Sequence, residues 1–369
     1  MVLSPGDHRE ARVAMFDPYS LVRPLIGLLN PETAHDIVIG TLRAGLVPSP
    51  EMFESPLLKQ KVWGRSFLNP VGLAAGFDKN ALVVNPMLEQ GFGFVEVGTV
   101  TPQPQIGNAR PRLFRLSKDK AVINRLGFNN DGMEEVASRL EACSRKGIVG
   151  VNLGKNKDTL DAIGDYREGV LRFSQVADYL VINVSSPNTV GLRGLQRKEV
   201  LLGLLETVLQ ARLEVIPINP PPLLLKVAPD LSPEDIIDIA EVALETGIDG
   251  IIATNSTIKR PSNLIDANAQ ESGGLSGQPL LDQSTHVLSE MYKLTAGKIP
   301  LVGVGGVSSG ADAYAKIRAG ATLIQLYSAM VFHGPAHVQL IKRDLARHLV
   351  ADGFSTISQA IGSAHYQTK

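Results

Sequence analysis

Short apolar runs recur along most of the chain, and each ends in small or polar residues before a helix-like stretch. From residue 70 onward there are eight such runs, beginning at Pro70, Phe92, Gly147, Asp178, Pro221, Gly247, Ile299 and Ala321. Continuous apolar strands that alternate with helices predict a parallel sheet covered by helices. Eight units are the number that closes a (β/α)8 TIM barrel, so the predicted fold class is α/β of that type. A doubly wound open sheet is the alternative, and the count argues against it.

The stretch before the barrel has a different pattern. Apolar residues recur there at helical spacing, first at Leu21, Val22, Leu25, Ile26, Leu28 and Leu29 and then at Ile37, Val38, Ile39, Leu42 and Leu46. Pro31 follows Asn30 and stands where the first residue of a second helix would. We expect two short helices, which either pack on the main domain or rest their apolar faces in a lipid interface with Arg23 and Arg43 at the headgroups. The spacing of the apolar residues by itself favours packing of these helices on the main domain.

Composition narrows the class of protein. The 369 residues are 44% apolar and 20% charged, which excludes a disordered chain. Lys plus Arg is 36 and Asp plus Glu is 37, a net charge of −1, so no basic surplus points to nucleic acid and no such partner is expected. No apolar stretch is long enough for a spanning helix, and the first fifteen residues do not form a secretory signal.

Metal and thiol chemistry have little support. The single cysteine, Cys143, forbids an internal disulfide and any all-cysteine metal site, and it lies in a helix-like stretch where a half-buried role is expected. Neither an HExxH motif nor a carboxylate cluster is present, so we expect no metal. The longest insertion, residues 101–116, follows the second run and is interpreted as an extended loop or hairpin.

Polar residues gather where the predicted strands end. They are Lys79, Thr99, Asn152, Asn183, Ser186, Lys226, Thr254 and Asn255. In a barrel these ends converge on one mouth, where such folds place their chemistry. The loops after the last two strands, GVGGVSSG and QLYSAM, have the glycines and the helix start that favour phosphate, although glycine turns alone are the alternative.

The lysines and asparagines at the mouth indicate an anionic, planar ligand. An ammonium that ends an apolar strand, as Lys226 does, needs an anionic partner, and Lys79 has the same position one strand away. Each lysine alone fits a structural ion pair equally well, but two beside a phosphate site favour a flavin or another anionic group. The asparagines, although often turn formers, suit a heterocycle with alternating C=O and N–H groups; they are Asn124, Asn152, Asn183, Asn188 and Asn255.

Proton transfer has one candidate segment. NVSSPNT, which begins at Asn183, holds two adjacent serines, one of which could act on a substrate proton. No histidine lies at the end of a predicted barrel strand, so a serine–histidine nucleophile has no support.

These motifs resemble a known family. The segments AAGFDKN, VEVGTVTPQPQ, GNARPRLFRL, INRLGFNN, GVNLGKNK, INVSSPNT, LLLKVAPDLS, ATNST, GGLSGQPL, GVGGVSS and QLYSA together resemble class 2 dihydroorotate dehydrogenase. The resemblance runs in order and spacing from about Asn30 to Ile361. INVSSPNT with GVNLGKNK is highly specific, whereas GVGGV alone is weak.

The resemblance implies the reaction and its residues. One FMN per chain would oxidise dihydroorotate to orotate in pyrimidine biosynthesis, with a membrane quinone as final acceptor. FMN would contact Ala74, Ala75, Gly76, Phe77, Asp78, Thr99, Asn152, Asn183, Lys226, Thr254, Gly277, Gly306, Tyr327 and Ser328. Substrate would contact Lys79, Asn124, Arg125, Leu126, Gly127, Phe128, Asn183, Asn188, Asn255 and Ser256. Ser186 would be the base that takes the C5 proton while hydride leaves C6 for N5 of the flavin.

The resemblance also assigns the N-terminal helices. They would form a small two-helix membrane-associating extension through which quinone enters, its polar end near His35, Arg115 and Tyr327. The expected organisation is a flexible N-terminus (1–15), a quinone-tunnel segment (16–50) and an FMN-binding barrel (51–369). Eukaryotic members carry a transit peptide and a spanning segment ahead of these helices, and we expect neither here, which indicates peripheral attachment to the cytoplasmic face of a bacterial inner membrane. We also expect a monomer. Some relatives have a polar tunnel residue where this chain has Ile26.

Three other functions would account for part of this sequence pattern. Another FMN barrel acting on a different reduced heterocycle, such as a dihydrouridine synthase, calls for a cysteine acid and a basic surface. A class 1 dehydrogenase that reduces fumarate or NAD lacks the N-terminal helices and has cysteine in the place of Ser186. A phosphate-binding membrane scaffold without activity leaves Ser186 and the asparagines without a purpose.

Overall fold

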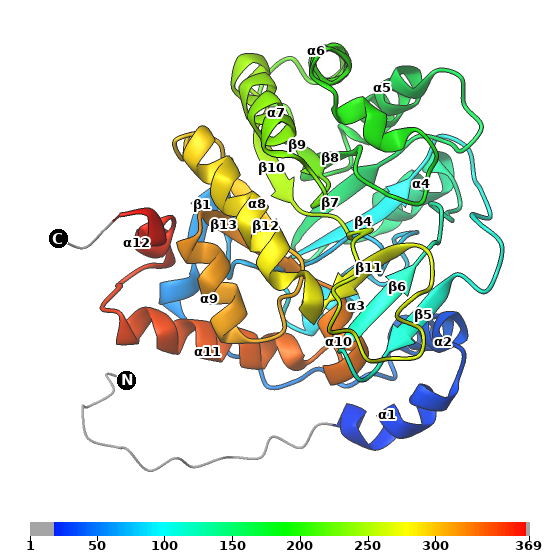
Figure 1. Ribbon diagram of the computed structural model, residues 1–369, viewed down its shortest axis with the longest axis vertical. Helices are drawn as coiled ribbons and strands as arrows, with labels where there is room; N and C mark the ends of the chain where they lie inside the picture. The colour runs from blue at the N-terminus through cyan, green and yellow to red at the C-terminus, as the bar shows by residue number, and fades with distance from the viewer. Residues whose placement is uncertain (1–17, 367–369) are drawn as a thin grey trace.

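The eight predicted strands close into one barrel. The computed structural model describes residues 18–366, and its parallel strands follow one another around the barrel in chain order (Figure 1). They are β3 (Val71–Leu73), β4 (Phe94–Val100), β7 (Ile148–Leu153), β8 (Tyr179–Asn183), β9 (Leu223–Val227), β10 (Gly250–Ala253), β12 (Leu301–Val304) and β13 (Ala321–Leu326). Each lies within one of the expected apolar runs, so the predicted (β/α)8 barrel is confirmed.

Helices cover the outside of the barrel (Figure 1). They are α3 (Val84–Glu89), α4 (Met133–Ala142), α5 (Ala162–Phe173), α6 (Lys198–Val215), α7 (Pro233–Thr246), α8 (Leu281–Leu294), α9 (Gly310–Arg318), α10 (Ser328–His333), α11 (His337–Ala351) and α12 (Ile357–Ala360). Local signals fix their ends. In α7, Ser232 and Asp235 form a capping box around Pro233, and Gly247 ends the helix with a left-handed φ of 67°. Cys143 caps the C-terminus of α4 and is half-buried, as expected.

Aromatic side chains seal the amino end of the barrel. The hairpin of β1 (Gln60–Val62) and β2 (Arg65–Phe67) carries Phe67, whose ring meets that of Phe94 edge to face at 5.5 Å. The rings of Phe94 and Tyr179 fill the space beside two strand glycines: a Cβ added at Gly72 would lie 2.2 Å from Phe94, and one at Gly150 would lie 2.1 Å from Tyr179. Because this end is packed, a ligand has room only at the opposite, carboxyl end.

The insertion after β4 forms a small sheet with a distant segment. Its hairpin consists of β5 (Leu113–Leu116) and β6 (Ala121–Asn124), and β11 (Gly274–Gly277) adds a third antiparallel strand beside β6. The sequence predicted an extended loop or hairpin over residues 101–116, whereas the hairpin lies over residues 113–124 and most of 101–112 is irregular. The third strand was not expected, because it comes from about 150 residues further along the chain. Short 3-10 helices complete the fold at Pro56–Leu58, Leu192–Gln196, Gln278–Leu280 and Ser363–His365.

Two helices precede the barrel, as predicted. They are α1 (Pro18–Leu28) and α2 (Pro31–Arg43), and the side chain of Asn30 caps α2 by accepting from the backbone N–H of Glu32 at 3.0 Å. Figure 1 shows both helices beside the β5–β6 hairpin. The segment 1–15, expected to be flexible, lies outside the described residues. Within residues 18–366, every helix is too short or too polar to cross a bilayer.

Candidate active site

A cavity of about 660 Å³ opens at the carboxyl ends of the barrel strands. It extends from the loops after β12 and β13, across the barrel mouth, to side chains of α1 and α2 such as Ile26 and Val38. This volume lies in the range of small-molecule and cofactor sites. The cavity therefore joins two parts of the chain that the sequence had assigned separately, the barrel mouth and the N-terminal helices.

Most of the residues expected at the site line this cavity. Those expected at FMN are Ala74, Ala75, Gly76, Phe77, Thr99, Asn183, Lys226, Thr254, Gly277, Gly306, Tyr327 and Ser328. Those expected at substrate or quinone are Lys79, Asn124, Leu126, Gly127, Phe128, Asn188, Asn255, Ser256, His35 and Arg115, and the expected base Ser186 lines it too. Three expected residues, Asp78, Asn152 and Arg125, are not among the lining residues.

Asp78 and Arg125 have other roles. The buried Asp78 carboxylate accepts hydrogen bonds from the backbone N–H groups of Leu82 (2.9 Å) and Val83 (2.8 Å), so it organises the turn after β3. Arg125 extends away from the cavity, pairs with Glu271 at 2.7 Å and stacks on the ring of Phe114. The family resemblance placed both near ligands together with their neighbours along the chain, and those neighbours do line the cavity.

Asn152 lies one layer beneath the cavity. It is fully buried, and its Oδ1 accepts from the Thr99 hydroxyl at 2.6 Å and from Asn183 Nδ2 at 3.0 Å. Asn183 Nδ2 also donates to the Thr99 hydroxyl at 2.9 Å. Asn152 thus fixes the orientation of two side chains that reach the cavity.

A buried carboxylate that the sequence analysis missed lies below this amide layer. Glu96 is fully buried on β4 and accepts from Asn152 Nδ2 (2.8 Å), Gln325 Nε2 (2.6 Å) and the Tyr179 hydroxyl (3.2 Å). Burial and the Glu96 charge raise the pKa of Tyr179 well above its usual value. The sequence did contain a signal for this cluster, because Glu96 in β4 and Gln325 in β13 are each a single strongly polar residue within an apolar strand.

The floor of the cavity has unused hydrogen-bonding capacity. The ammonium of Lys226 is buried, and its charged neighbour Glu96 lies 3.8 Å away, beyond hydrogen-bond distance. The Oε1 atom of Gln325 is also buried, and within residues 18–366 it has no hydrogen-bond partner. Within the described residues, the Lys226 ammonium has only the distant Glu96 carboxylate as a partner and Gln325 Oε1 has none, which fits a bound heterocycle with polar edges.

The other end of the cavity is rich in glycine and serine. It is lined by Gly277, Gly305, Gly306, Ser276, Ser308 and Ser328. Gly306 has a φ of +79°, and a Cβ there would lie 2.5 Å from the Cα of Leu281, so no other residue fits without moving the backbone. The hydroxyls of Ser276 and Ser328 are 2.9 Å apart. Close backbone and paired hydroxyls at a strand-to-helix turn suit a phosphate group.

The structure distinguishes the two adjacent serines. The Ser186 hydroxyl lines the cavity and accepts from the backbone N–H of Asn188 at 3.3 Å. The Ser185 hydroxyl is fully buried, where it donates to Asn183 Oδ1 at 2.9 Å and accepts from Asn255 Nδ2 at 3.0 Å. Ser186 is therefore available to a ligand, whereas Ser185 supports two of the amides.

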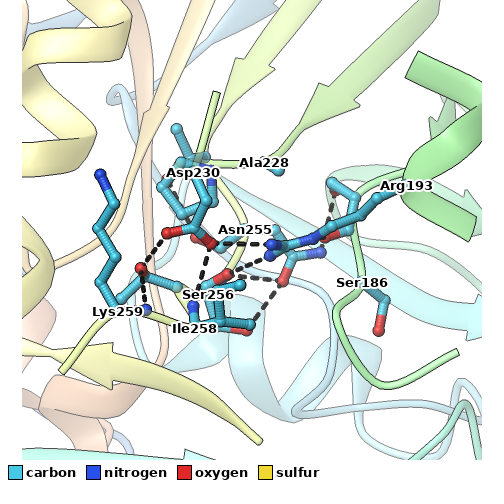
Figure 2. A network of polar contacts seen from close by, with 12 residues as sticks. Ser186, Arg193, Ala228, Asp230, Asn255, Ser256, Ile258 and Lys259 are labelled. Carbon is cyan, nitrogen blue, oxygen red and sulfur yellow. Dashed lines mark hydrogen bonds and ion pairs between the residues drawn. The ribbon is translucent and has the colours of Figure 1, made fainter. Parts of the chain in front are cut away.

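One guanidinium joins the loops that surround Ser186. Figure 2 shows Arg193 between Asp230 and the backbone of neighbouring loops. It donates to Ser185 O (3.0 Å), Asp230 Oδ2 (2.8 Å) and Ser256 O (2.9 Å), which follow β8, β9 and β10. Burial alone would raise the pKa of Asp230, but hydrogen bonds from Thr257, Ile258 and Arg193 together hold it below its usual value. The Arg193–Asp230 ion pair therefore fixes the loops after β8, β9 and β10 relative to one another.

An aromatic cluster lines the arm of the cavity toward the N-terminal helices. The His35 ring lies edge to face on Phe77 at 5.3 Å, and Tyr327 lies 5.6 Å from Phe77. Burial, followed by the charge of Lys79, lowers the pKa of His35 to about 3, so the imidazole is neutral at pH 7. Arg115 Nη1 donates to the carbonyl of Gly27 at 2.9 Å and ties α1 to the β5–β6 hairpin.

Lys79 lies between this arm and the amide cluster. Burial lowers its pKa from 10.5 to about 8, although the carboxylates of Glu32 and Asp36 on α2 act in the opposite direction. Its ammonium is a ready partner for an anion in the cavity. Within residues 18–366, no group of three His, Cys, Asp or Glu side chains could hold a metal ion.

Comparisons with a family model, with curated proteins and with solved structures all match dihydroorotate dehydrogenases. The family model described as dihydroorotate dehydrogenase matches residues 57–349. The chain is 55% identical over 355 residues to a dihydroorotate dehydrogenase (quinone) of Rhodospirillum rubrum, covering 96% of this chain and 97% of that one. It is 52% identical to the mitochondrial quinone enzyme of Mus musculus, covering 94% and 89%. A crystal structure of DHODH from Eimeria tenella in complex with ferulenol superimposes with a TM-score of 0.89 at 43% identity, covering 93% and 99%.

Proposed function

The chain belongs to the dihydroorotate dehydrogenase family, and we propose from its cavity how its residues perform the reaction. It oxidises dihydroorotate to orotate in pyrimidine biosynthesis and passes the electrons to a quinone. The observation that carries the assignment of residues is the cavity itself, which runs from the glycine-rich loops through the amide cluster to α1 and α2.

The cofactor we propose is FMN, one per chain. When bound, FMN supplies the hydride acceptor. The backbone and hydroxyls around Gly277, Gly306 and Ser328 would hold its phosphate, and Thr99, Asn183 and Lys226 would hold its ring system. Two observations within residues 18–366 support this fit: the Lys226 ammonium is 3.8 Å from its counter-ion Glu96, and Gln325 Oε1 has no hydrogen-bond partner.

The amide cluster would orient the substrate. Asn124, Asn183, Asn188 and Asn255 present donors and acceptors to a pyrimidine edge, with Ser256 and the segment from Leu126 to Phe128 beside them. Their side chains are already fixed by mutual contacts; for example, Asn188 Nδ2 donates to Asn124 Oδ1 at 3.2 Å. Lys79 would pair with the carboxylate of dihydroorotate. Such preorganisation lowers the cost of binding.

Ser186 would be the base. Its hydroxyl would take the proton from C5 of dihydroorotate, and the backbone N–H of Asn188 holds its oxygen in place. Serine is a weak base, so this proton has to pass onward to water. Ser186 itself is nearly excluded from bulk solvent, so the water that receives this proton has to lie within the cavity.

The quinone would enter between α1 and α2. His35, Arg115 and Tyr327 would surround its polar end, with Ile26 and Val38 along its apolar path. Large apolar side chains of this segment are exposed, among them Leu25 (68%) and Leu28 (85%). An exposed apolar surface beside an apolar channel supports peripheral contact with a bilayer, which we propose is the cytoplasmic face of a bacterial inner membrane.

A visible spectrum of the purified protein tests the function. Without oxygen, dihydroorotate is expected to bleach the flavin absorbance, and a ubiquinone analogue should restore it, whereas fumarate and NAD should not. A flavin that dihydroorotate fails to bleach would contradict the substrate. Reoxidation by fumarate or NAD would contradict the quinone site.

The affinity for orotate is expected to fall above about pH 8. The bound carboxylate favours the protonated form of Lys79, so binding is tightest below the pKa of the free site, which is about 8. Affinity should then decline by up to about tenfold per pH unit as Lys79 loses its proton. Titration of the flavin spectrum with orotate from about pH 6 to 10 measures this. Lys79→Met should bind weakly and lose the decline; a decline that persists in that variant would contradict the assignment.

A further inference from the structure

Helix α2 carries a carboxylate that does not line the cavity. Glu32 lies in the first turn of α2 and is only 8% exposed. It accepts from Arg112 Nη2 at 2.6 Å and Nε at 3.1 Å, and from Arg110 Nη2 at 3.0 Å. Arg112 is 6% exposed and belongs to the extended segment after β4. A buried carboxylate of the N-terminal helices is thus paired with the barrel insertion.

The same guanidinium organises the segment that follows β4. Arg112 Nη1 donates to the carbonyls of Ile106 (2.5 Å) and Asn108 (2.8 Å), which bends the chain around the arginine. The N–H of Arg125 in turn donates to the carbonyl of Arg112 at 2.8 Å. Glu32 therefore fixes the orientation of a side chain that organises residues 106–112 of this loop.

Asn108 carries the connection to the substrate side of the cavity. Its Nδ2 donates to the carbonyls of Asn188 (3.2 Å) and Arg125 (3.1 Å), and its backbone N–H donates to the carbonyl of Leu126 at 2.9 Å. Asn188 then reaches Asn124. Every residue at the end of this path either lines the cavity or is adjacent to one that does.

We propose that Glu32, on a helix assigned to quinone entry, is a positioning residue of the substrate site, which it holds in place through Arg112 and Asn108. The inference rests on the proposed function, because it takes Asn124, Asn188 and the segment to Phe128 as the substrate contacts. It means that α2 serves both half-reactions and that removing this helix disturbs more than the quinone path.

The alternative is that Glu32 only attaches α2 to the barrel. Under either role, removing Glu32 or Arg112 lowers the stability of the folded protein, because the remaining buried charge is left without its partner. The two half-reactions separate these possibilities, because loss of a mere anchor of α2 would slow quinone reoxidation alone, whereas loss of a positioning residue weakens orotate binding. The groups facing Lys79 are Glu32, Asp36 and His35 of α2, Asp78 on its own turn, and Arg112; Glu32 is the largest of the contributions that raise its pKa. Loss of the Glu32 charge should therefore also shift the pH profile of orotate binding, as a second readout at Lys79.

The experiment uses the full-length holoenzyme with Glu32→Gln. We expect orotate to bind roughly tenfold more weakly, the loss of a charge-assisted hydrogen bond. The decline of affinity at high pH should move to lower pH, because Lys79 loses a stabilising charge. Reoxidation of the reduced flavin by a quinone analogue should change by less than about twofold, since Glu32 does not line the cavity.

Two further variants serve as controls. Glu51→Gln removes an exposed carboxylate from the same N-terminal region and should change none of these quantities. Glu32→Asp keeps the charge and should leave the pH profile in place even where affinity falls. If Glu32→Gln does not fold, Arg112→Lys should show the same weakened orotate binding, because lysine cannot hold Glu32 and both carbonyls together.

Two results would contradict the role proposed for Glu32. Unchanged orotate binding and an unchanged pH profile in folded Glu32→Gln would overturn the proposal, as would slower quinone reoxidation alone. Failure of the proposed function is separate, because then dihydroorotate would not bleach the flavin of the unaltered protein.

Discussion

Replacing Ser186 by alanine is expected to slow reduction of the flavin by dihydroorotate by roughly 10²–10⁴-fold, the usual contribution of a general base. The Ser186 hydroxyl lines the cavity, and its oxygen accepts from the backbone N–H of Asn188 without making any other hydrogen bond within residues 18–366. It is therefore free to take a proton. Rapid mixing without oxygen, followed by flavin absorbance, gives the rate directly.

The neighbouring serine is the matched control. Ser185→Ala removes a hydroxyl that is buried between Asn183 and Asn255, so its effect should stay below roughly 30-fold, the worth of two neutral hydrogen bonds of about 1 kcal/mol each. Both variants should keep FMN, because neither hydroxyl belongs to the proposed cofactor contacts. Equal effects of the two substitutions, or reduction by Ser186→Ala within about twofold of the unaltered protein, would remove Ser186 from the role of base.

Replacing Lys226 by alanine is expected to weaken FMN binding by roughly 10- to 150-fold, the worth of a hydrogen bond to a charged group. The ammonium is buried at the cavity floor with no hydrogen bond to the described protein, so a bound ring system would supply its partner. Fluorescence of FMN released on dilution measures the dissociation constant. A variant that retains FMN as tightly as the unaltered protein would contradict the assignment.

A second variant separates binding from folding. Lys226→Ala leaves the Glu96 carboxylate buried without its charged neighbour, which by itself costs stability, of the order of 3–5 kcal/mol for a buried pair. The double variant Lys226→Ala with Glu96→Gln removes that charge as well. If the double variant regains thermal stability but still binds FMN weakly, the loss belongs to the lysine contact. If it regains both, Lys226 acts only by neutralising Glu96.

Local patterns were sufficient to predict the fold. Each barrel strand is a continuous apolar run because both of its faces are buried, and the runs alternate with helices that have readable caps, such as Ser232 and Gly247 of α7. The helix start at Pro31 was predicted in the same way. The third strand of the small sheet was not predictable, since Gly274–Gly277 pairs with Ala121–Asn124 across a large separation in sequence.

Several residues that line the cavity could be predicted from their position near the end of a strand, although Asn152 at the end of β7 lies beneath the cavity. Thr99, Asn183 and Lys226 end barrel strands and reach the cavity, as expected. Residues in turns were harder to place, because a turn can aim each successive side chain differently. Asp78 is aimed into its own turn although Phe77 and Lys79, on either side of it, line the cavity.

The sequence by itself determined the barrel, its polar mouth and the two preceding helices, because these depend on burial patterns and capping signals that repeat over a few residues. Only the tertiary structure decided which adjacent serine faces the cavity, that Glu96 lies beneath Lys226, and that Glu32 is buried against Arg112. These contacts join residues about 80 to 130 positions apart. They exist because closing the barrel brings its strand ends together and because α2 docks on the insertion after β4, and neither event leaves a local pattern in the chain.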